Sequence, residues 1–84
     1  MTMPSGKQGP SGPFARAIAA QVREAMARHR ISAARLAPLI DVSQSYLSKR
    51  LRDEVPLTLN DVEAICAALG EDVQAMVART EGDK

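Results

Sequence analysis

The stretch "SAARLAPLIDVSQSYLSKRL", residues 32–51, repeats one local pattern twice. Ser32 and Ser43 each stand directly before a run whose aliphatic residues recur at three- and four-residue spacing, which is typical of an amphipathic helix. Serine is a preferred N-cap, because its hydroxyl accepts a hydrogen bond from a free N–H of the first turn. The pattern predicts two short helices separated by the turn "DVS", residues 41–43.

Two residues of this stretch depart from regular geometry. Pro38 lies inside the first helix, where it lacks a backbone N–H and its ring crowds the preceding turn, so we expect a kink or a local irregularity. Asp41 lies in the turn and is expected to adopt a left-handed conformation, which aspartate tolerates better than most residues. Leu36, Leu39 and Ile40 are expected to face the interior.

Helical patterns flank this pair on both sides. The segment "FARAIAAQVREAMARHR", residues 14–30, has apolar residues at helical spacing and predicts a longer first helix. After a loop that contains proline, Thr58 and Asp61 have the spacing of a capping box, which predicts a helix over residues 59–69. Gly70 is the natural terminator of that helix, because glycine readily adopts the left-handed backbone of a C-cap.

The two ends of the chain show less helical periodicity. Residues 1–13 contain three prolines, three glycines and two serines and are predicted to form a flexible arm, since they cannot bury enough apolar surface to order themselves. Asp72 can cap a last short helix, after which residues 80–84 are expected to fray as a C-terminal tail. The predicted domain therefore covers residues 14–79.

The composition favours one small all-helical domain. The chain has 84 residues, of which 45% are hydrophobic and 2% aromatic, and alanine and leucine recur throughout. No apolar run approaches the roughly 20 residues that cross a bilayer, and the N-terminus lacks the apolar core of a signal peptide, so a cytoplasmic protein is expected. Cys66 is the only cysteine, which excludes an internal disulfide and a multi-cysteine metal site. No cofactor or small-molecule ligand is evident.

The charges divide unevenly along the chain. Residues 1–52 hold nine Lys and Arg against two acids, a net charge of +7, whereas residues 53–84 hold two against eight, a net charge of −6. This asymmetry predicts a positive face suited to a polyanion. The alternative is that the charges only coat solvated helix faces.

Two short helices joined by a three-residue turn have the geometry of a helix-turn-helix, whose second helix can lie in the major groove of DNA. The order and spacing of "LA" at 36–37, "VSQSYLS" at 42–48 and "LTLNDVEAICAALG" at 57–70 resemble the helix-turn-helix domain of phage lambda-type repressors and Cro proteins, the XRE family. The resemblance implies an all-α, compact lambda-repressor-like domain of five helices, with double-stranded DNA as its partner.

The resemblance also implies which residues contact DNA. The start of the second helix of the pair reads base edges, and the residues there and one turn later are Gln44, Ser45 and Lys49, with Ser48 in second rank. A glutamine amide can pair with adenine, serine can donate or accept, and lysine reaches guanine or a phosphate. The predicted phosphate contacts are Ser32, Ala33, Arg35, Arg50 and Arg52. Each of these residues could instead belong to a solvated helix face.

Two positions differ from the family pattern. Many members pair an arginine of the first helix with a glutamate at the end of the third, but Met26 and Leu51 match those positions here, so an apolar contact is expected. The loop after the third helix is often basic in the family, whereas here it contains Asp53 and Glu54. That loop is therefore not expected to hold a phosphate.

These features predict a sequence-specific DNA-binding transcriptional regulator, such as a small phage-type repressor or a Cro-like switch, on the nucleoid of a bacterial or phage-infected cell. The alternative is a protein-interaction module, such as an antitoxin-like or adaptor subunit, with secondary or no DNA binding. Salt-sensitive binding to short duplexes discriminates the two. An enzyme is not expected, because His29 is the only histidine and no serine or cysteine has a recognisable base partner.

A homodimer, or a dimer that forms on DNA, is also expected. Helix-turn-helix proteins usually bind two half-sites about one helical turn apart, and one small domain covers little DNA. The predicted contact lies on the last helix at Val73, Met76 and Val77. These three side chains could instead complete the core.

Overall fold

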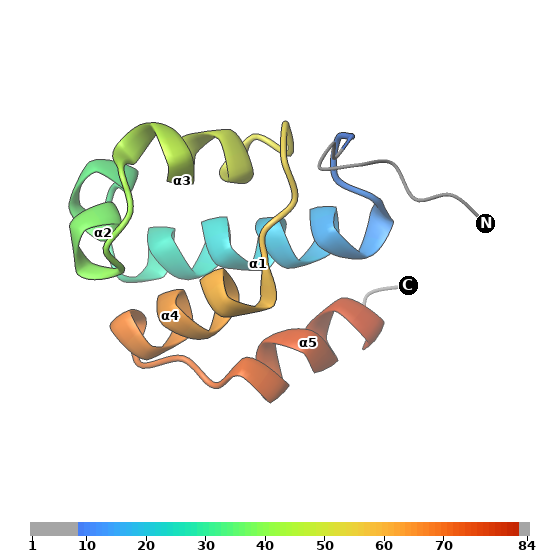
Figure 1. Cartoon of the computed structure of the whole chain (residues 1–84). Helices are drawn as coiled ribbons and strands as arrows, with labels where there is room; N and C mark the ends of the chain where they lie inside the picture. The colour runs from blue at the N-terminus through green and yellow to red at the C-terminus, as the bar shows by residue number, and fades with distance from the viewer. Residues whose placement is uncertain (1–8, 83–84) are drawn as a thin grey trace.

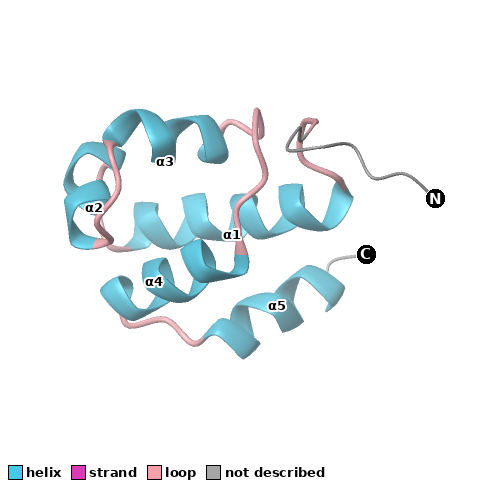
Figure 2. Ribbon diagram, in the orientation of Figure 1, coloured by secondary structure: helices cyan, strands magenta, loops and turns pink. Residues whose placement is uncertain are grey.

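The helices of the protein begin and end close to the predicted positions. The computed structural model describes residues 9–82, in which the chain forms α1 (Pro13–Arg28), α2 (Ala33–Leu39), α3 (Gln44–Leu51), α4 (Leu59–Leu69) and α5 (Val73–Gly82) (Figure 1). This part of the chain contains no strand (Figure 2). None of its helices combines the length and apolar character that a membrane span requires. The predicted all-α domain of five helices is confirmed.

Local hydrogen bonds set most of these boundaries. The hydroxyls of Ser32 and Ser43 accept bonds of 3.2 and 3.0 Å from the backbone N–H three residues on, as expected of N-caps. Thr58 and Asp61 form a complete capping box, with both reciprocal bonds at 3.0 Å. Gly70 ends α4 with a φ of 70°, in the left-handed region that glycine adopts without strain.

The core forms where all five helices meet. Each helix contributes at least one side chain without exposed surface, and the largest from each helix are Val22, Leu36, Leu47, Ile65 and Met76. Burying a side chain of this size contributes about 1.5–3 kcal/mol. Figure 1 shows α1 running between α3 on one side and α4 and α5 on the other. Met26 and Leu51 belong to the same buried cluster, in agreement with the apolar contact expected between α1 and the end of α3.

The helix α2 differs from the prediction in one side chain. Leu39 is 62% exposed, because α2 buries the arc around Leu36 and Ala37, and at about 100° per residue Leu39 lies about 110° from the middle of that arc. The helix continues through Pro38, which is exposed, and ends one residue later, so the proline occupies the last turn. Asp41 has a φ of 62° and takes the expected left-handed conformation.

The N-terminal boundary also differs from the prediction. Pro13 is already the first residue of α1, a position where its missing N–H costs nothing. Ser11 is buried, and its N–H donates a hydrogen bond of 3.2 Å to the carbonyl oxygen of Asp53. The boundary predicted between arm and domain therefore moves toward the N-terminus, because Pro13 belongs to α1 and Ser11 contacts the loop after α3. Residues 1–8 of that arm lie outside the described residues.

The C-terminal boundary is extended by one helical turn. Because α5 continues to Gly82, the predicted frayed tail is wrong for residues 80–82, and residues 83–84 lie outside the described part of the chain. The hydroxyl of Thr80 donates a hydrogen bond of 2.6 Å to the carbonyl of Val77, so residue 80 is bonded to the preceding turn.

A polar cluster ties α1 to the start of α5. Glu71, in the loop between α4 and α5, lies 2.9 Å from His29 Nε2 and 3.2 Å from Arg28 Nη2, and its other oxygen lies 3.7 Å from Arg79 Nη2. The hydrogen bond from His29, followed by that from Arg28, lowers the pKa of Glu71 below its ordinary value of 4.5. Arg79 also donates to Gln21 of α1 at 2.8 Å.

This cluster predicts acid-sensitive docking of α5. A carboxyl group whose pKa is lowered by folding stabilises the folded state above its unfolded pKa, and this contribution is lost as the pH falls through the folded value. We expect the thermal midpoint of the wild type to fall below pH 4.5 more steeply than that of Glu71→Gln, measured by circular dichroism between pH 3 and 7. Parallel pH profiles for the two proteins would contradict the assignment.

Candidate nucleic-acid interface

The helices α2 and α3 form a helix-turn-helix unit. After α2, the N–H groups of Ile40 and Val42 both donate to the carbonyl of Ala37, each at 3.1 Å, and the left-handed Asp41 reverses the chain between them. The turn thus satisfies the free carbonyls at the end of α2 while it directs the chain into the cap of α3. The two helices pack against each other, α3 also packs against α1, and α2 also packs against α4.

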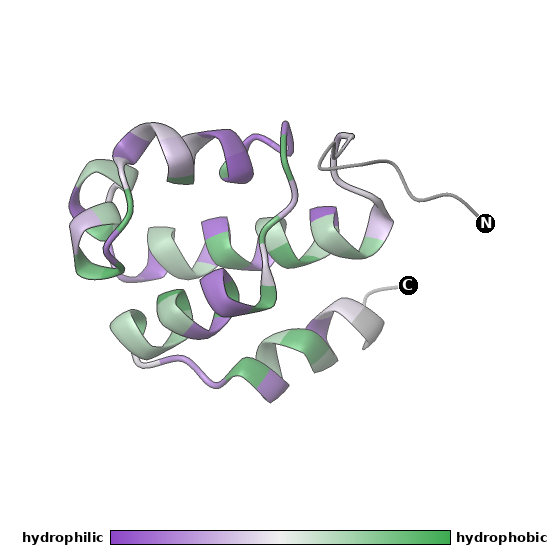
Figure 3. Cartoon of the chain, in the orientation of Figure 1, coloured by the Kyte–Doolittle hydropathy of each residue, from purple (hydrophilic) through white to green (hydrophobic). Residues whose placement is uncertain are grey.

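The outer face of α3 carries the four predicted base-reading residues. At about 100° per residue, Gln44, Ser48, Ser45 and Lys49 occupy one arc of about 140° around the helix axis. Gln44, Ser45 and Lys49 are exposed, and Ser48 is half-buried. Figure 3 shows α3 as a predominantly hydrophilic helix. The fold therefore brings all four side chains to one face.

The inner side of α3 holds a polar cluster that the sequence analysis did not identify. The Tyr46 hydroxyl donates to the carboxylate of Asp61 on α4, with 3.1 Å to each oxygen. The Arg50 guanidinium lies 3.5 Å from the Tyr46 ring centroid, and its Nε lies 3.5 Å from Asp61. Burial, with the hydrogen bond to Asp61, raises the pKa of Tyr46, so the hydroxyl stays protonated as a donor. The four-residue spacing of Tyr46 and Arg50 was the available signal, but nothing local pointed to Asp61.

This cluster argues against the predicted phosphate contact of Arg50. Its side chain is only 15% exposed and also donates to the Tyr46 carbonyl at 3.1 Å. A phosphate contact would require the guanidinium to leave both the aromatic ring and the carboxylate. We therefore assign Arg50 a structural role in holding α3 against α4, in place of the predicted phosphate contact.

Other arginines are also engaged. Arg52, a second predicted phosphate contact, donates to Glu54 at 2.8 Å, and the hydrogen bond lowers the pKa of Glu54. This pair is exposed, so it is weak and can open to solvent. Arg23 of α1 donates to the carbonyl of Leu51 at the end of α3 and lies 3.8 Å from Asp53. The two acidic residues of the loop after α3 therefore form ion pairs with arginines of the same domain.

Four cations of residues 9–82 form no salt bridge within that range: Arg16, Arg30, Arg35 and Lys49. Arg30 stands between α1 and α2, Arg35 lies on α2, and Lys49 lies on α3. Three of these four cations therefore lie on the helix-turn-helix unit or directly before it, where they are available to a polyanion partner, and Arg16 lies on α1.

The remaining predicted phosphate contacts lie at the start of α2. Ser32 is exposed and Ala33 half-buried. The Ser32 hydroxyl is used to cap the N–H of Arg35, which leaves the earlier N–H groups of the first turn as the donors for an anion.

Comparisons with known proteins agree with this architecture. A family model of the helix-turn-helix domain matches residues 17–79. Two crystal structures of the clp gene regulator ClgR from Corynebacterium glutamicum are similar. One has 26% sequence identity and a TM-score of 0.77, covering 87% of this chain and 78% of that chain. The other has 25% identity and a TM-score of 0.76, covering 86% and 94%. The search of curated proteins gave no match.

The family match covers well over half of the chain and includes α2, α3 and α4 completely. The two structural matches cover 87% and 86% of this chain. The protein therefore belongs to the XRE-like helix-turn-helix family of DNA-binding transcriptional regulators.

Proposed function

We propose that the protein is a sequence-specific regulator, a small phage-type repressor or Cro-like switch, that reads the major groove of double-stranded DNA with α3. The observation that supports this most strongly is the single outer face of α3, which carries Gln44, Ser45, Ser48 and Lys49. An α-helix with its side chains is about 10–12 Å across, which fits the major groove of about 12 Å. Such a regulator works on the nucleoid, in the cytoplasm of a bacterial or phage-infected cell.

Each residue on this face has a role that fits its chemistry. Gln44 offers a donor and an acceptor to an adenine edge, and the serine hydroxyls bond to several bases. Lys49 reaches guanine or a phosphate. Arg30 and Arg35, together with the N–H groups at Ser32 and Ala33, hold the phosphates beside the groove. Arg52 adds a phosphate contact only when its exposed pair with Glu54 opens.

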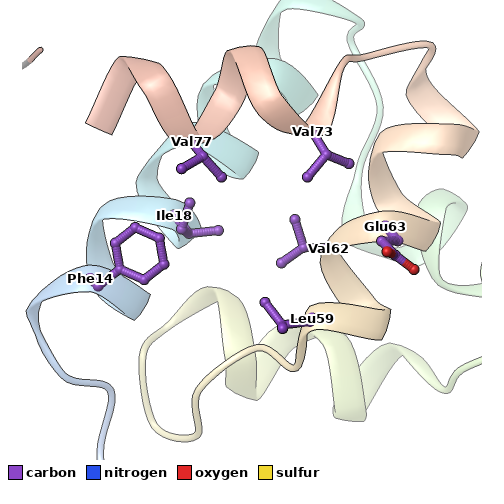
Figure 4. A pocket seen from close by; sticks show the side chains of 7 residues that line it. All are labelled: Phe14, Ile18, Leu59, Val62, Glu63, Val73 and Val77. Carbon is purple, nitrogen blue, oxygen red and sulfur yellow. The ribbon is translucent and has the colours of Figure 1, made fainter. Parts of the chain in front are cut away.

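A homodimer is the second part of the proposal. Met76 is completely buried, so it serves the core and not the predicted dimer contact. Val73 and Val77 are half-buried and, with Phe14 and Leu59, line an apolar cavity of about 250 Å³ between α1, α4 and α5 (Figure 4). Phe14 is 55% and Leu59 78% exposed, so apolar projections and an apolar cavity lie on one surface. A twofold contact needs such a self-complementary surface.

We expect Leu59→Asp to shift the protein from dimer toward monomer. A charge placed in an apolar contact is costly to desolvate, and we expect the dimer dissociation constant to rise by about tenfold or more. Sedimentation equilibrium of free protein and of its complex with DNA measures this. Leu39→Asp is the matched control, because Leu39 is also an exposed leucine, at 62%, but lies on α2. A strictly monomeric, one-to-one wild-type complex would refute the dimer.

The DNA specificity itself is tested by selection of bound sequences from random duplex DNA. The expected result is an enriched motif with two related half-sites about 10 base pairs apart, since a twofold dimer presents two copies of α3 about one helical turn apart. Recovery of no motif would contradict sequence-specific binding and favour the protein-interaction function. Recovery of one unpaired half-site would support reading by α3 and contradict the dimer.

A further inference from the structure

The apolar side chains of α3 hold it along a single line. Leu47 and Leu51 are the buried leucines of this eight-residue helix, and they lie about 40° apart around its axis. Contacts along one narrow stripe keep a helix against its neighbours but resist rotation about its own axis poorly. The reading face, whose centre lies about 110° around the axis from the two leucines, would turn with any such rotation.

A second stripe supplies the missing restraint. Tyr46 and Arg50 also lie about 40° apart around the axis, and their stripe is about 100° away from that of the leucines. Both side chains meet Asp61, through the 3.1 Å hydrogen bonds of the tyrosine and the 3.5 Å ion pair of the arginine. The side chains of Arg50 and Asp61 are 15% and 10% exposed, so solvent screens this contact little.

The anchor on α4 is itself fixed. One carboxylate oxygen of Asp61 accepts the N–H of Thr58, and the N–H of Asp61 donates to the Thr58 hydroxyl, both at 3.0 Å. Rotation of the Asp61 side chain would break the capping box that starts α4. The carboxylate is therefore a rigid point on a helix separate from the α1 and α2 surfaces against which α3 packs.

We propose that Tyr46, Arg50 and Asp61 are positioning residues for DNA reading, which fix the rotation of α3 and so determine which side chains reach the base edges. The proposal rests on the DNA reading by α3 proposed above. A rotation of 20° moves a side-chain end on a helix of about 5–6 Å radius by about 2 Å. A binding constellation must be held within about 0.5 Å, so base contacts would be lost. Lysine and arginine side chains that contact phosphates are long and flexible enough to keep their contacts after such a movement.

The test compares the affinities of Arg50→Gln and Tyr46→Phe for the selected duplex and for a scrambled one, well below each melting temperature. We expect Arg50→Gln to lower the ratio of specific to non-specific affinity by about tenfold or more, and Tyr46→Phe by about threefold, since each lost base contact weakens only the specific complex. Non-specific affinity should change by less than about twofold. Tyr46→Phe removes one oxygen atom and keeps the aromatic ring under Arg50, so this variant is expected to fold.

Two further variants sharpen the comparison. Arg50→Lys keeps a positive charge near Asp61 and is expected to recover part of the ratio that Arg50→Gln loses. Arg79→Gln removes one arginine from α5, on the other side of α1 from α3, and is expected to leave the ratio unchanged (Figure 1). It is the matched control for the loss of one positive charge.

Several results would overturn the proposal. An unchanged ratio in both Arg50→Gln and Tyr46→Phe would show that the cluster only stabilises the fold. If Arg50→Gln lowers the affinity for both duplexes equally, and the slope of log binding constant against log salt concentration becomes shallower by about 1, then Arg50 holds a phosphate. A wild type without preference for any duplex would instead refute base reading by α3 itself, and the positioning role with it.

Discussion

Gln44→Ala is expected to weaken binding to the selected duplex by about 1–3 kcal/mol, a factor of about 5–150 in dissociation constant. Gln44 is exposed on the first turn of α3, where its amide can pair with one base. The loss should therefore fall on one base pair of each half-site, and the preference at that pair should flatten. Binding to a scrambled duplex should hardly change, because phosphate contacts carry non-specific affinity. Fluorescence anisotropy titrations at several salt concentrations measure the affinity for the selected duplex and for the scrambled one.

Arg35→Ala is the matched comparison for this experiment. Arg35 is exposed on α2 and forms no salt bridge with the described residues, so its loss should weaken all duplexes together. The slope of the logarithm of the binding constant against the logarithm of the salt concentration should become shallower by about 1. If Gln44→Ala leaves both affinity and base preference intact, the outer face of α3 is only solvated, and the protein-interaction function gains support.

Leu47→Ala is expected to destabilise the domain by about 2–5 kcal/mol, because the substitution opens a cavity in a packed core. Leu47 has no exposed surface and places α3 in the core cluster to which all five helices contribute. A domain of this size has a total stability of about 5–10 kcal/mol, so the melting temperature should fall by about 10–40 °C. Thermal unfolding followed by circular dichroism measures the change.

The control for the core substitution is Leu39→Ala. Leu39 is 62% exposed on α2, and removing it opens no internal cavity. Its effect on stability should stay within about 0.5 kcal/mol. A similar loss for the two leucines would contradict the arrangement of α2 and α3 described above. Below the lowered midpoint of Leu47→Ala, the folded fraction should still prefer the selected duplex.

The sequence predicted the helices because their boundaries depend on residues close to one another in the chain. The caps at Ser32, Ser43 and Thr58 and the terminator Gly70 each act over three or four residues. The outer face of α3 follows from helical periodicity once the helix is placed. For the same reason the family resemblance, which rests on the spacing of short motifs, led to the correct fold.

The ends of the domain were predicted less well. Glycine, proline and serine at residues 9–13 indicate a loop, and the sequence does not show that Ser11 pairs with the backbone of Asp53. The bond joins residues 42 positions apart. It exists only after α1 and α3 have packed, and no local pattern encodes it.

The tertiary structure decided the availability of most of the positive charges. Arg50 and Arg52 look alike in the sequence, but folding buries Arg50 against Tyr46 and Asp61 and leaves Arg52 at the surface beside Glu54. Arg28 meets Glu71, which lies 43 residues later in the chain. A sequence shows which side chains carry a charge, whereas ion pairing depends on distances that only packing sets. The sequence by itself therefore determined the helix-turn-helix unit and the polar outer face of α3, and the tertiary structure decided which cations are left without an ion pair among the described residues.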